Sequence, residues 1–199
     1  MPKIVDHAVR RGEIAMAACR AIAAHGLKTA TVRDIAHEAN CTTGMVTYYF
    51  ETKGDIVAAA LRIVLERVER RLERALKKEH CDLFAILSQS LPLDKARRFE
   101  TAVWISFWGV LGTHAEFRKL SRSLHLEWTA LVRKCVLAGH PPSQNWTATT
   151  LDWIVTSLVV TLNGIDAGSV STPGAYPKKV QHGLLKQQIQ FLTESQIKF

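Results

Sequence analysis

Hydroxyl-bearing side chains gather in one short stretch of the chain, residues 31–53, which reads TVRDIAHEANCTTGMVTYYFETK. Thr43, Thr47 and Tyr48 are spaced so that they share the outer face of a short helix. Hydroxyls on a protruding helix can hydrogen-bond to base edges or phosphates, and a threonine methyl can contact a thymine methyl. The chemistry that this pattern predicts is noncovalent recognition, with nucleic acid as one candidate ligand.

Three further residues of the stretch fit that interpretation. Gly44 lets the backbone approach another surface closely. Lys53 begins the next helix, where its charge and free backbone N–H groups can hold a phosphate. Arg33 lies early on the preceding helix and can reach into the same groove. Polar surface residues without a ligand would give the same pattern, so the residues alone leave both interpretations open.

Three helices are predicted to position these side chains. The first repeats apolar residues on one face, and Gly26 ends it, as glycine does at helix C-termini. Thr31 can cap a second helix, and Asn40 lies where a turn needs a left-handed residue. Thr42 or Thr43 can cap a third helix, which is too short to be stable without packing. The face expected to pack carries Val46, Tyr49 and Phe50.

The order of these helices and the short connection between the last two are typical of a helix-turn-helix unit. The remainder of the chain is also predicted to be helical, beginning with a long helix from Lys53 to about Lys78. Asp94 is expected to cap one later helix, and Pro177 to lie in the first turn of the last. Breaks are expected near residues 80–82, 91–94, 112–115, 139–143 and 168–177, the last as a flexible loop.

Composition and charge narrow the class of protein. The 199 residues carry 26 Lys and Arg against 18 Asp and Glu, a net charge of +8 that favours a polyanionic partner, either nucleic acid or an anionic membrane. The most apolar run, residues 153–162, is shorter than the roughly 20 residues that cross a bilayer. The N-terminus lacks the apolar stretch of a signal peptide, and the four cysteines are widely spaced. A cytoplasmic protein with reduced thiols is therefore expected.

Catalytic and metal-binding patterns are weak. His37 and Cys41 are four residues apart on or beside one helix, but two ligands alone make a poor metal site. The sequence shows neither a glycine-rich phosphate loop nor a G-x-S-x-G nucleophile motif. We therefore predict no enzyme activity, no cofactor and no metal.

The N-terminal stretch with these features resembles the DNA-binding domain of the TetR family of transcriptional regulators. The resemblance covers about residues 8–65 and is carried by Gly26, the block TVRDIA at 31–36, Gly44, and YF-x-x-K ending at Lys53. The turn has Asn-Cys-Thr where the family usually has Gly-Val-Ser. Val46 and Thr47 stand where Leu-Tyr is common, which removes a tyrosine that often contacts DNA.

The resemblance implies a role for individual residues. Base-contacting positions of the family match Arg33, Thr43, Gly44 and Thr47. Positions that mostly contact phosphates match Thr31, Thr42, Tyr48, Tyr49 and Lys53. The remaining two, Arg10 and Arg11, precede the core of the first helix and are expected at the DNA backbone or the adjacent minor groove.

The C-terminal part is similar to that of BetI-type members, through the order of its segments and the WxxFW pattern that runs from Trp104 to Trp108. BetI is a choline-responsive repressor, but the subgroup includes regulators with different ligands. A quaternary ammonium favours aromatic faces beside a carboxylate. Residues expected to line such a pocket are Trp104, Trp108, Trp128, Trp153, Glu100 and Asp152. Aromatic residues at helical spacing are more often core, so ordinary packing is the competing interpretation.

The last two long helices, about 147–167 and 175–195, are expected to include a dimer interface, because two such helices from each subunit form a four-helix bundle in this family. Apolar residues available for it are Leu158, Val159, Leu162, Leu184, Leu185, Ile189 and Leu192. Packing within one subunit is the alternative use of these residues.

Together these observations predict an all-α protein. Residues 1–52 are expected to form a helix-turn-helix DNA-binding domain, and residues 53–199 a helical ligand-binding and dimerisation domain. The predicted function is a dimeric repressor of a pseudo-palindromic operator that a small-molecule effector, with a choline-like cation as one candidate, releases from DNA. Two alternatives stay open: a helical metabolite-binding protein without specific DNA binding, and a non-specific architectural DNA binder.

Overall fold

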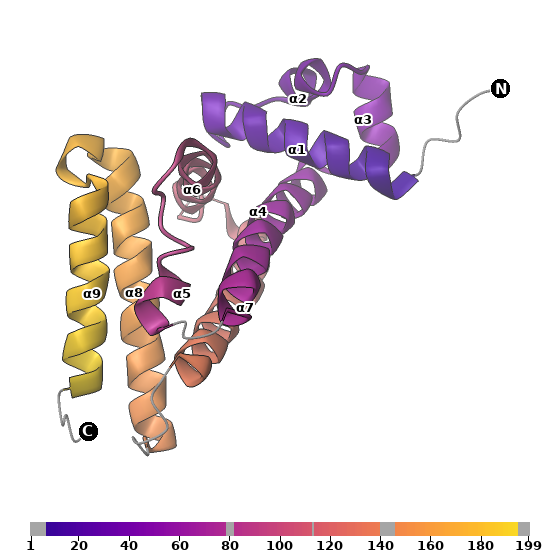
Figure 1. Ribbon diagram of the computed structural model, residues 1–199. Coiled ribbons are helices and arrows are strands. Elements are labelled where there is room, and N and C mark those ends of the chain that lie inside the picture. The colour runs from indigo at the N-terminus through magenta and orange to yellow at the C-terminus, as the bar shows by residue number, and fades with distance from the viewer. Residues whose placement is uncertain (1–6, 79–81, 113, 140–145, 195–199) are drawn as a thin grey trace. The chain divides into compact units, whose positions relative to one another are not determined.

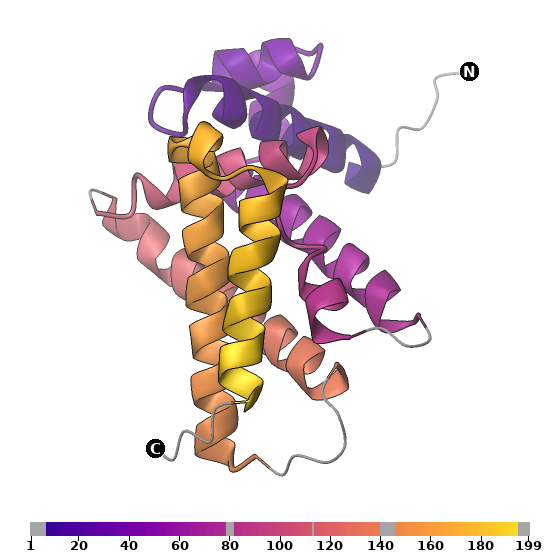
Figure 2. The same cartoon turned by 60° about the vertical axis from the view of Figure 1, so that its left-hand side comes forward.

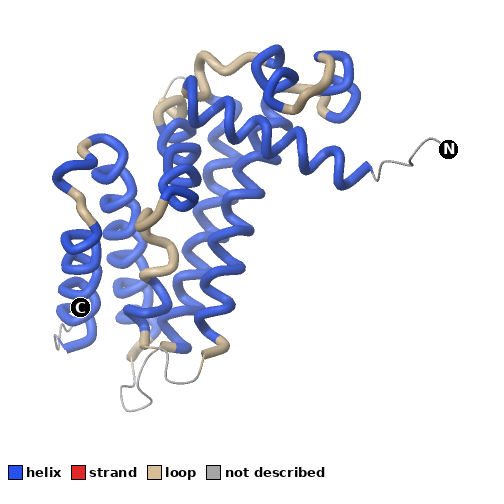
Figure 3. Tube along the Cα trace, turned by 45° about the horizontal axis from the view of Figure 1, so that its top comes forward, coloured by secondary structure: helices blue, strands red, loops and turns tan. Residues whose placement is uncertain are grey.

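The computed structural model describes residues 7–78, 82–112, 114–139 and 146–194, and all regular structure within these ranges is helical (Figure 3). This confirms the predicted fold class. In chain order (Figure 1) the elements are α1 (His7–His25), α2 (Val32–Glu38), α3 (Thr43–Tyr49), α4 (Lys53–Leu76), α5 (Leu83–Leu87), α6 (Lys95–Trp108), the 3-10 turn η1 (Ala115–Phe117), α7 (Arg118–Ala138), α8 (Ala148–Ser171), the 3-10 turn η2 (Pro173–Ala175) and α9 (Lys178–Glu194).

The chain divides into two compact units. The first unit comprises Met1–Glu66 and Ala102–Ser121, and the second comprises Arg67–Thr101 and Arg122–Phe199. The expected boundary at residue 53 coincides with the start of α4, but the first unit includes α4 up to Glu66. Three long helices, α4, α6 and α7, therefore contribute residues to both units.

The first unit is built on α1, whose apolar face consists mostly of small residues. Four alanines of α1 are buried together with Ile14, Cys19 and Ile22. Small side chains let α2 and α3 pack closely, and Val46 of α3 is completely buried. Gly26 ends α1 with φ +78°, the left-handed conformation expected at a helix C-terminus.

The second unit has its own core, formed by apolar residues of α4, α5, α7, α8 and α9. Leu72, Leu87, Val132, Val155 and Leu158 are among its fully buried members. Helices α8 and α9 lie side by side, as Figures 1 and 2 both show, and η2 lies in the short connection between them.

Helix α8 extends well beyond residues 153–162, the apolar run that the sequence analysis considered too short to cross a bilayer. By length and composition alone, Ala148–Ser171 is long and apolar enough to cross a membrane. Core helices of soluble proteins have the same profile, and one face of α8 is buried in the second core through Ile154, Val155 and Leu162. We interpret α8 as a core helix.

The helix boundaries agree with several predictions, but Pro177 lies just before α9, which begins at Lys178, rather than in its first turn. Asp94 caps α6, because its carboxylate accepts a hydrogen bond of 2.9 Å from the Arg97 amide. The flexible loop expected over residues 168–177 is shorter, since α8 continues to Ser171. The ring of Tyr176 packs against Gly168, where any Cβ would overlap it. The breaks expected near residues 80–82 and 139–143 lie largely outside the described residues.

The thiols fit the expected reduced state where the structure describes them. Cys41 and Cys135 are free, and Cys19 Sγ donates to the Ala60 carbonyl oxygen at 3.4 Å. Burial raises the pKa of Cys135 to about 11, so this thiol is a poor nucleophile at neutral pH. Cys81 lies outside the described residues.

Candidate nucleic-acid interface and effector region

The start of α2 is fixed by a reciprocal capping box. The Thr31 hydroxyl accepts from the Asp34 amide at 3.2 Å, while the Asp34 carboxylate accepts from the Thr31 amide at 2.8 Å. Hydrogen bonds from Thr31 hold the pKa of Asp34 below its usual range, so the carboxylate stays charged. The cap brings Thr31 to the N-terminus of α2, and Arg33 follows on its exposed surface.

The turn between α2 and α3 has the geometry that the sequence predicted. Asn40 has φ 47°, and the Cys41 amide donates to the Ala36 carbonyl at 2.9 Å. Thr42 then caps α3 by accepting a hydrogen bond of 3.2 Å from the Met45 amide. A left-handed residue followed two positions later by a cap lets the two short helices follow each other with only a few residues between them.

Helix α3 has a buried face and an exposed face. Val46 and Phe50 are 0% and 3% exposed, whereas Tyr48 is 75% exposed. The other exposed residues on the predicted recognition face are Thr43, Gly44 and Thr47. The hydroxyl of Thr47 lies 3.1 Å from the carbonyl oxygen of Gly44 and 3.2 Å from that of Thr43, so its proton is already used within α3.

An arginine and a histidine of α1 hold the end of α3. Arg11 donates from Nη1 to the Tyr49 carbonyl oxygen, and its guanidinium lies 4.1 Å from the centre of the Phe50 ring. The His7 ring packs 4.5 Å from that of Tyr49, which in turn packs edge-on against Tyr48 at 5.1 Å. Sequence reasoning missed His7, because only the fold brings it beside the tyrosines.

The remaining predicted DNA contacts also make interactions within the protein. Arg10 forms a salt bridge of 2.6 Å with Glu13. Lys53 donates from Nζ to the Leu27 carbonyl at 3.0 Å, which attaches the start of α4 to the turn after α1. Thr52, just before Lys53, forms a second capping box with Asp55 that the sequence analysis did not identify.

The six residues predicted to bind an effector are divided between the two units. Trp104 and Trp108 belong to the first, where Trp104 packs edge-on against Phe107 with ring centres 6.3 Å apart. In the second unit Trp128 is partly buried against the core, while Trp153 is 49% exposed. The remaining two residues are acids of the second unit, Glu100 and Asp152.

Both of these acids already have arginine partners. Glu100 is 3% exposed, and its two carboxylate oxygens accept from the Arg71 guanidinium at 2.6 and 3.2 Å. Arg67 Nη1 lies 3.7 Å from the same carboxylate. Asp152 is exposed and pairs with Arg133 of α7. The geometry therefore gives Glu100 a structural partner, which its position one turn before Trp104 did not reveal.

A third acid, Asp166 of α8, was not among the predicted site residues. It is partly buried, and its carboxylate accepts from the Thr101 hydroxyl at 3.4 Å. Burial raises the pKa of Asp166 to about 7, and the hydrogen bond from Thr101 lowers it only in part. No sequence motif marks this residue, because its burial depends on how α6 and α8 pack.

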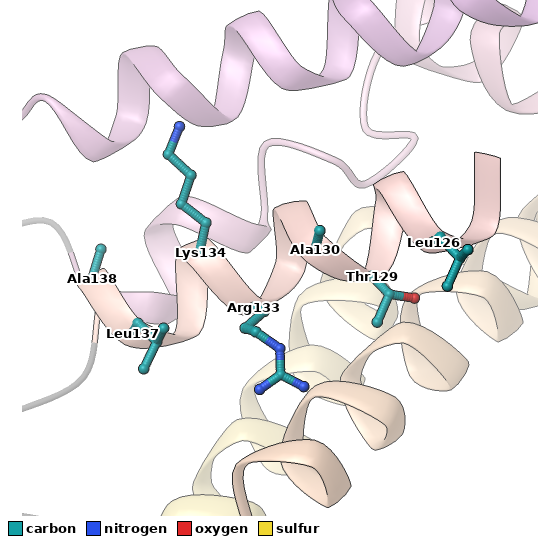
Figure 4. A pocket seen from close by; sticks show the side chains of 7 residues that line it. All are labelled: Leu126, Thr129, Ala130, Arg133, Lys134, Leu137 and Ala138. Atoms are coloured by element: carbon teal, nitrogen blue, oxygen red, sulfur yellow. The ribbon is translucent and has the colours of Figure 1, made fainter. Parts of the chain in front are cut away.

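An open hollow of about 680 Å³ lies along α7 in the second unit. Its lining, drawn in Figure 4, consists of Leu126, Thr129, Ala130, Arg133, Lys134, Leu137 and Ala138. Arg133 points toward α8, where it pairs with Asp152, and Lys134 points toward α4, where it meets Glu73 at 3.2 Å. None of the six predicted effector residues lines this hollow.

The predicted dimer surface requires a correction. Five of the seven apolar residues assigned to it are buried inside the subunit: Leu158, Val159, Leu162, Leu185 and Leu192. Exposed apolar residues of α8 and α9 instead include Val160, at 65%, Leu184, at 39%, and Phe191, at 57%. The last two line a hollow of about 460 Å³ between α8 and α9, together with Thr161, Gly164, Ile165, Tyr176, Gln187 and Gln188.

Comparison with known sequences decides the family. A sequence model of bacterial regulatory proteins of the tetR family matches residues 14–60, and one of the BetI-type transcriptional repressor C-terminal region matches residues 80–193. The chain belongs to the TetR family of transcriptional regulators. The TetR match spans most of α1, all of α2 and α3 with the capped turn between them, and the start of α4. The BetI-type match spans more than half of the chain.

Curated TetR relatives are regulators rather than enzymes. The HTH-type transcriptional regulator PksA of Bacillus subtilis is 35% identical over 112 residues, which is 54% of each chain. The HTH-type transcriptional regulator BetI of Brucella canis is 32% identical over 111 residues, 54% of this chain and 56% of the relative. The matched region spans about half the length of these relatives.

Solved structures extend the likeness to nearly the whole chain. A transcriptional regulator from Rhodococcus sp. Rha1 has a TM-score of 0.78 and 25% identity, covering 92% of this chain and 96% of that one. A regulator from Saccharomonospora viridis in complex with choline has a TM-score of 0.73 at 21% identity, covering 93% and 96%. The multidrug binding protein EbrR in complex with ethidium has a TM-score of 0.63 at 27% identity, covering 90% and 97%.

Proposed function

We propose that this TetR-family protein is a dimeric, ligand-responsive repressor that acts in the cytoplasm on a pseudo-palindromic operator. The observation that carries the proposal is the two-faced helix α3. Its apolar side is buried against α1 and α2, while Tyr48 and the small residues Thr43, Gly44 and Thr47 are presented outward. Such a helix fits the major groove, which admits an α-helix and displays distinct base edges.

Within that interface we assign sequence reading and positioning to different residues. Base-edge contacts are proposed for Arg33, Thr43, Gly44 and Thr47. Phosphate contacts are proposed for Thr31, Thr42, Tyr48, Tyr49 and Lys53, with Arg10 and Arg11 at the adjoining backbone. Thr31 and Thr42 support this division because they cap helices, where unpaired backbone N–H groups also attract phosphate.

Dimerisation would place two α3 helices about one turn of DNA apart, roughly 34 Å, so that the operator has two related half-sites. The exposed apolar residues Val160, Leu184 and Phe191 support an interface on α8 and α9. Burying such residues in a second subunit would remove apolar surface from water.

The effector is proposed to bind among the helices that follow α3 and to tilt α4. Tilting would change the separation of the two α3 helices and favour the state that does not fit DNA. Cationic effectors are the leading class, because structural neighbours hold choline and ethidium. The roles predicted for Trp104, Trp108, Trp128, Trp153, Glu100 and Asp152 remain part of this proposal, although both acids have arginine partners.

Selection of bound duplexes from fragmented genomic DNA at near-physiological salt tests this function. Enrichment of one inverted repeat is the expected result. Binding of all duplexes alike, with a steep dependence on salt, would indicate an architectural DNA binder instead. Residues 1–55 contain seven Lys or Arg against six Asp or Glu, and this near-neutral balance favours specific readout. Absence of any DNA binding would leave a helical metabolite-binding protein.

A further inference from the structure

The outward surface of α3 has a polar edge and an apolar edge. Because successive helical residues are about 100° apart, Thr47 and Met45 lie on opposite sides of Tyr48. Met45 is 41% exposed, and Tyr48 is the other large apolar side chain that α3 leaves in solvent. Met45 is not among the DNA contacts proposed above, although it lies on the same outward surface.

The Met45 side chain is held from α1 by Arg10. The Arg10 guanidinium donates from Nη2 to the Met45 sulfur at 3.4 Å, and from Nη1 to the Glu13 carboxylate at 2.6 Å. The two ends of the guanidinium are therefore used by one residue of α1 and one of α3. Methionine is flexible, with three rotatable bonds, so a contact at its sulfur reduces the freedom that the side chain must lose when it meets a ligand.

The chemistry of methionine limits what Met45 can recognise. Its side chain has no charge and no hydrogen-bond donor, so it is unsuited to holding a phosphate. Polar base edges are also poor partners, because an apolar group that covers them leaves their donors and acceptors unpaired. The apolar group that the major groove displays is the C5-methyl of thymine, which cytosine lacks.

We propose that Met45 is a specificity-determining residue that reads the C5-methyl group of one thymine in each half-site, and that Arg10 and Glu13 position it. This inference rests on the proposed function, because it requires α3 to lie in the major groove. It adds an apolar contact to the base contacts proposed for Arg33 and the threonines of α3. It also gives Arg10 a positioning role within the protein, besides its proposed contact with the DNA backbone.

Replacement of thymine by deoxyuridine tests the contact, because it removes the C5-methyl group and leaves the base pairing unchanged. Duplexes of the selected operator carry this replacement at one symmetric pair of positions at a time, and fluorescence anisotropy measures Kd for each. At one such pair, wild type should bind the uracil duplex about fourfold more weakly for each half-site, as for the loss of one buried methyl group.

Variants of α3 assign that preference to a side chain. Met45→Ala should bind the thymine and uracil duplexes equally at this position, and should bind the uracil duplex about as tightly as wild type does. The second equality also shows that the variant is folded. Met45→Leu keeps an apolar side chain and should retain part of the preference. The matched control Thr47→Ser removes a methyl group from the opposite edge and should keep the full preference, whatever its overall affinity.

The same duplexes test the positioning roles of Arg10 and Glu13. Glu13→Gln removes the charge partner of Arg10 and should reduce the preference for thymine. It should also steepen the slope of log K against log salt by about one for each subunit, because the released guanidinium can reach a phosphate. Arg10→Ala should reduce the preference without steepening the slope. A substitution that only damaged folding would weaken binding to both duplexes and leave their ratio unchanged.

Three results would overturn the assignment of Met45: no position at which wild type distinguishes thymine from uracil, a preference that Met45→Ala leaves intact, or one that Thr47→Ser abolishes instead. An unchanged preference in both Arg10→Ala and Glu13→Gln would overturn the positioning roles. Operator selection comes first, so that the two failures stay distinct. A protein that selects no inverted repeat fails the proposed function, whereas one that selects a repeat without a methyl contact through Met45 remains a specific regulator.

Discussion

At the scale of single residues, α3 shows which features helical spacing can predict and which depend on the fold. Exposure of Thr43, Gly44 and Thr47 could be predicted from helical spacing, because Val46 and Phe50 define the opposite face. The packing of His7 and Arg11 against the end of α3 could not, since those contacts join residues about 40 positions apart. The same limit applies to Asp166, whose environment depends on long-range packing.

Arg33 and Lys53 are expected to contribute to DNA binding in different ways. Arg33→Ala should reduce the preference for the operator over other sequences, because it removes the base contact that we propose for Arg33. Lys53→Ala should weaken binding to all duplexes and reduce the slope of log K against log salt by about one, as for one lost phosphate contact. Fluorescence anisotropy over a salt series measures both quantities, and Lys178→Ala, in the second unit, is the control. If both variants bind like wild type, the contact assignment is wrong.

Asp166 makes stability depend on pH near neutrality. Its pKa is about 7 in the folded protein and about 3.9 in the unfolded chain, so the folded state holds the proton more tightly. The stabilising effect of that proton is complete below pH 4 and is lost as pH rises through 7. One pKa unit corresponds to about 1.4 kcal/mol, which sets an upper bound of about 4 kcal/mol.

Asp166→Asn should therefore gain stability over wild type between pH 5 and 8, with the difference disappearing near pH 4. The hydrogen-bond partner of Asp166 does not obscure this, because the Thr101 hydroxyl carries no charge in this pH range. Chemical denaturation of both proteins across this range gives the difference directly. An unchanged difference at every pH would show that Asp166 titrates normally.

At the scale of elements, helix caps and turns were the most predictable features. Thr31, Thr42 and Gly26 each have the predicted role, because capping depends on residues within three or four positions. The end of α8 was predicted less well. Gly168 is typical of a helix end, but there it accommodates the Tyr176 ring, a contact that sequence spacing does not reveal.

Substitutions at Asn40 test the turn between α2 and α3. At φ 47° an alanine is strained by its Cβ, so Asn40→Ala should lower the free energy of unfolding by about 1 kcal/mol. Asn40→Gly tolerates the same conformation and should be close to neutral. Urea denaturation of the three proteins measures the difference. Equal losses for alanine and glycine would mean that the Asn40 side chain, rather than its backbone, stabilises the turn.

Substitution of Gly168 tests the packing between α8 and the segment before α9. A Cβ at this position would overlap the Tyr176 ring, so Gly168→Ala should destabilise the protein by about 1–3 kcal/mol despite the helix propensity of alanine. In a protein that already carries Tyr176→Ala, the substitution Gly168→Ala should cost less stability than it does in wild type, because the ring that the added Cβ would overlap is absent. Additive losses in the double-mutant cycle would exclude the contact.

At the scale of the whole molecule, the proposed function requires two subunits, and we propose that the exposed apolar residues of α8 and α9 form the surface between them. Leu184 and Phe191 line one hollow, and a second copy related by a two-fold axis would present the same residues to it. Five of the seven apolar residues that the sequence assigned to this surface are instead buried inside the subunit. Both faces of α8 and α9 are rich in apolar residues, and only the fold shows which face the second core already covers.

Phe191→Glu should therefore shift the protein toward monomer and weaken operator binding, because a single subunit contacts one half-site only. Charge at this site would be buried without a partner in the dimer, while in the monomer it would stay in water. Leu137→Glu is a matched control, since Leu137 is equally apolar and 58% exposed but lies on α7. Light scattering over a concentration series should give a dimer mass for wild type and Leu137→Glu and a monomer mass for Phe191→Glu. A wild-type monomer at micromolar concentration would rule out the dimer, whereas dissociation by Leu137→Glu alone would move the interface to α7.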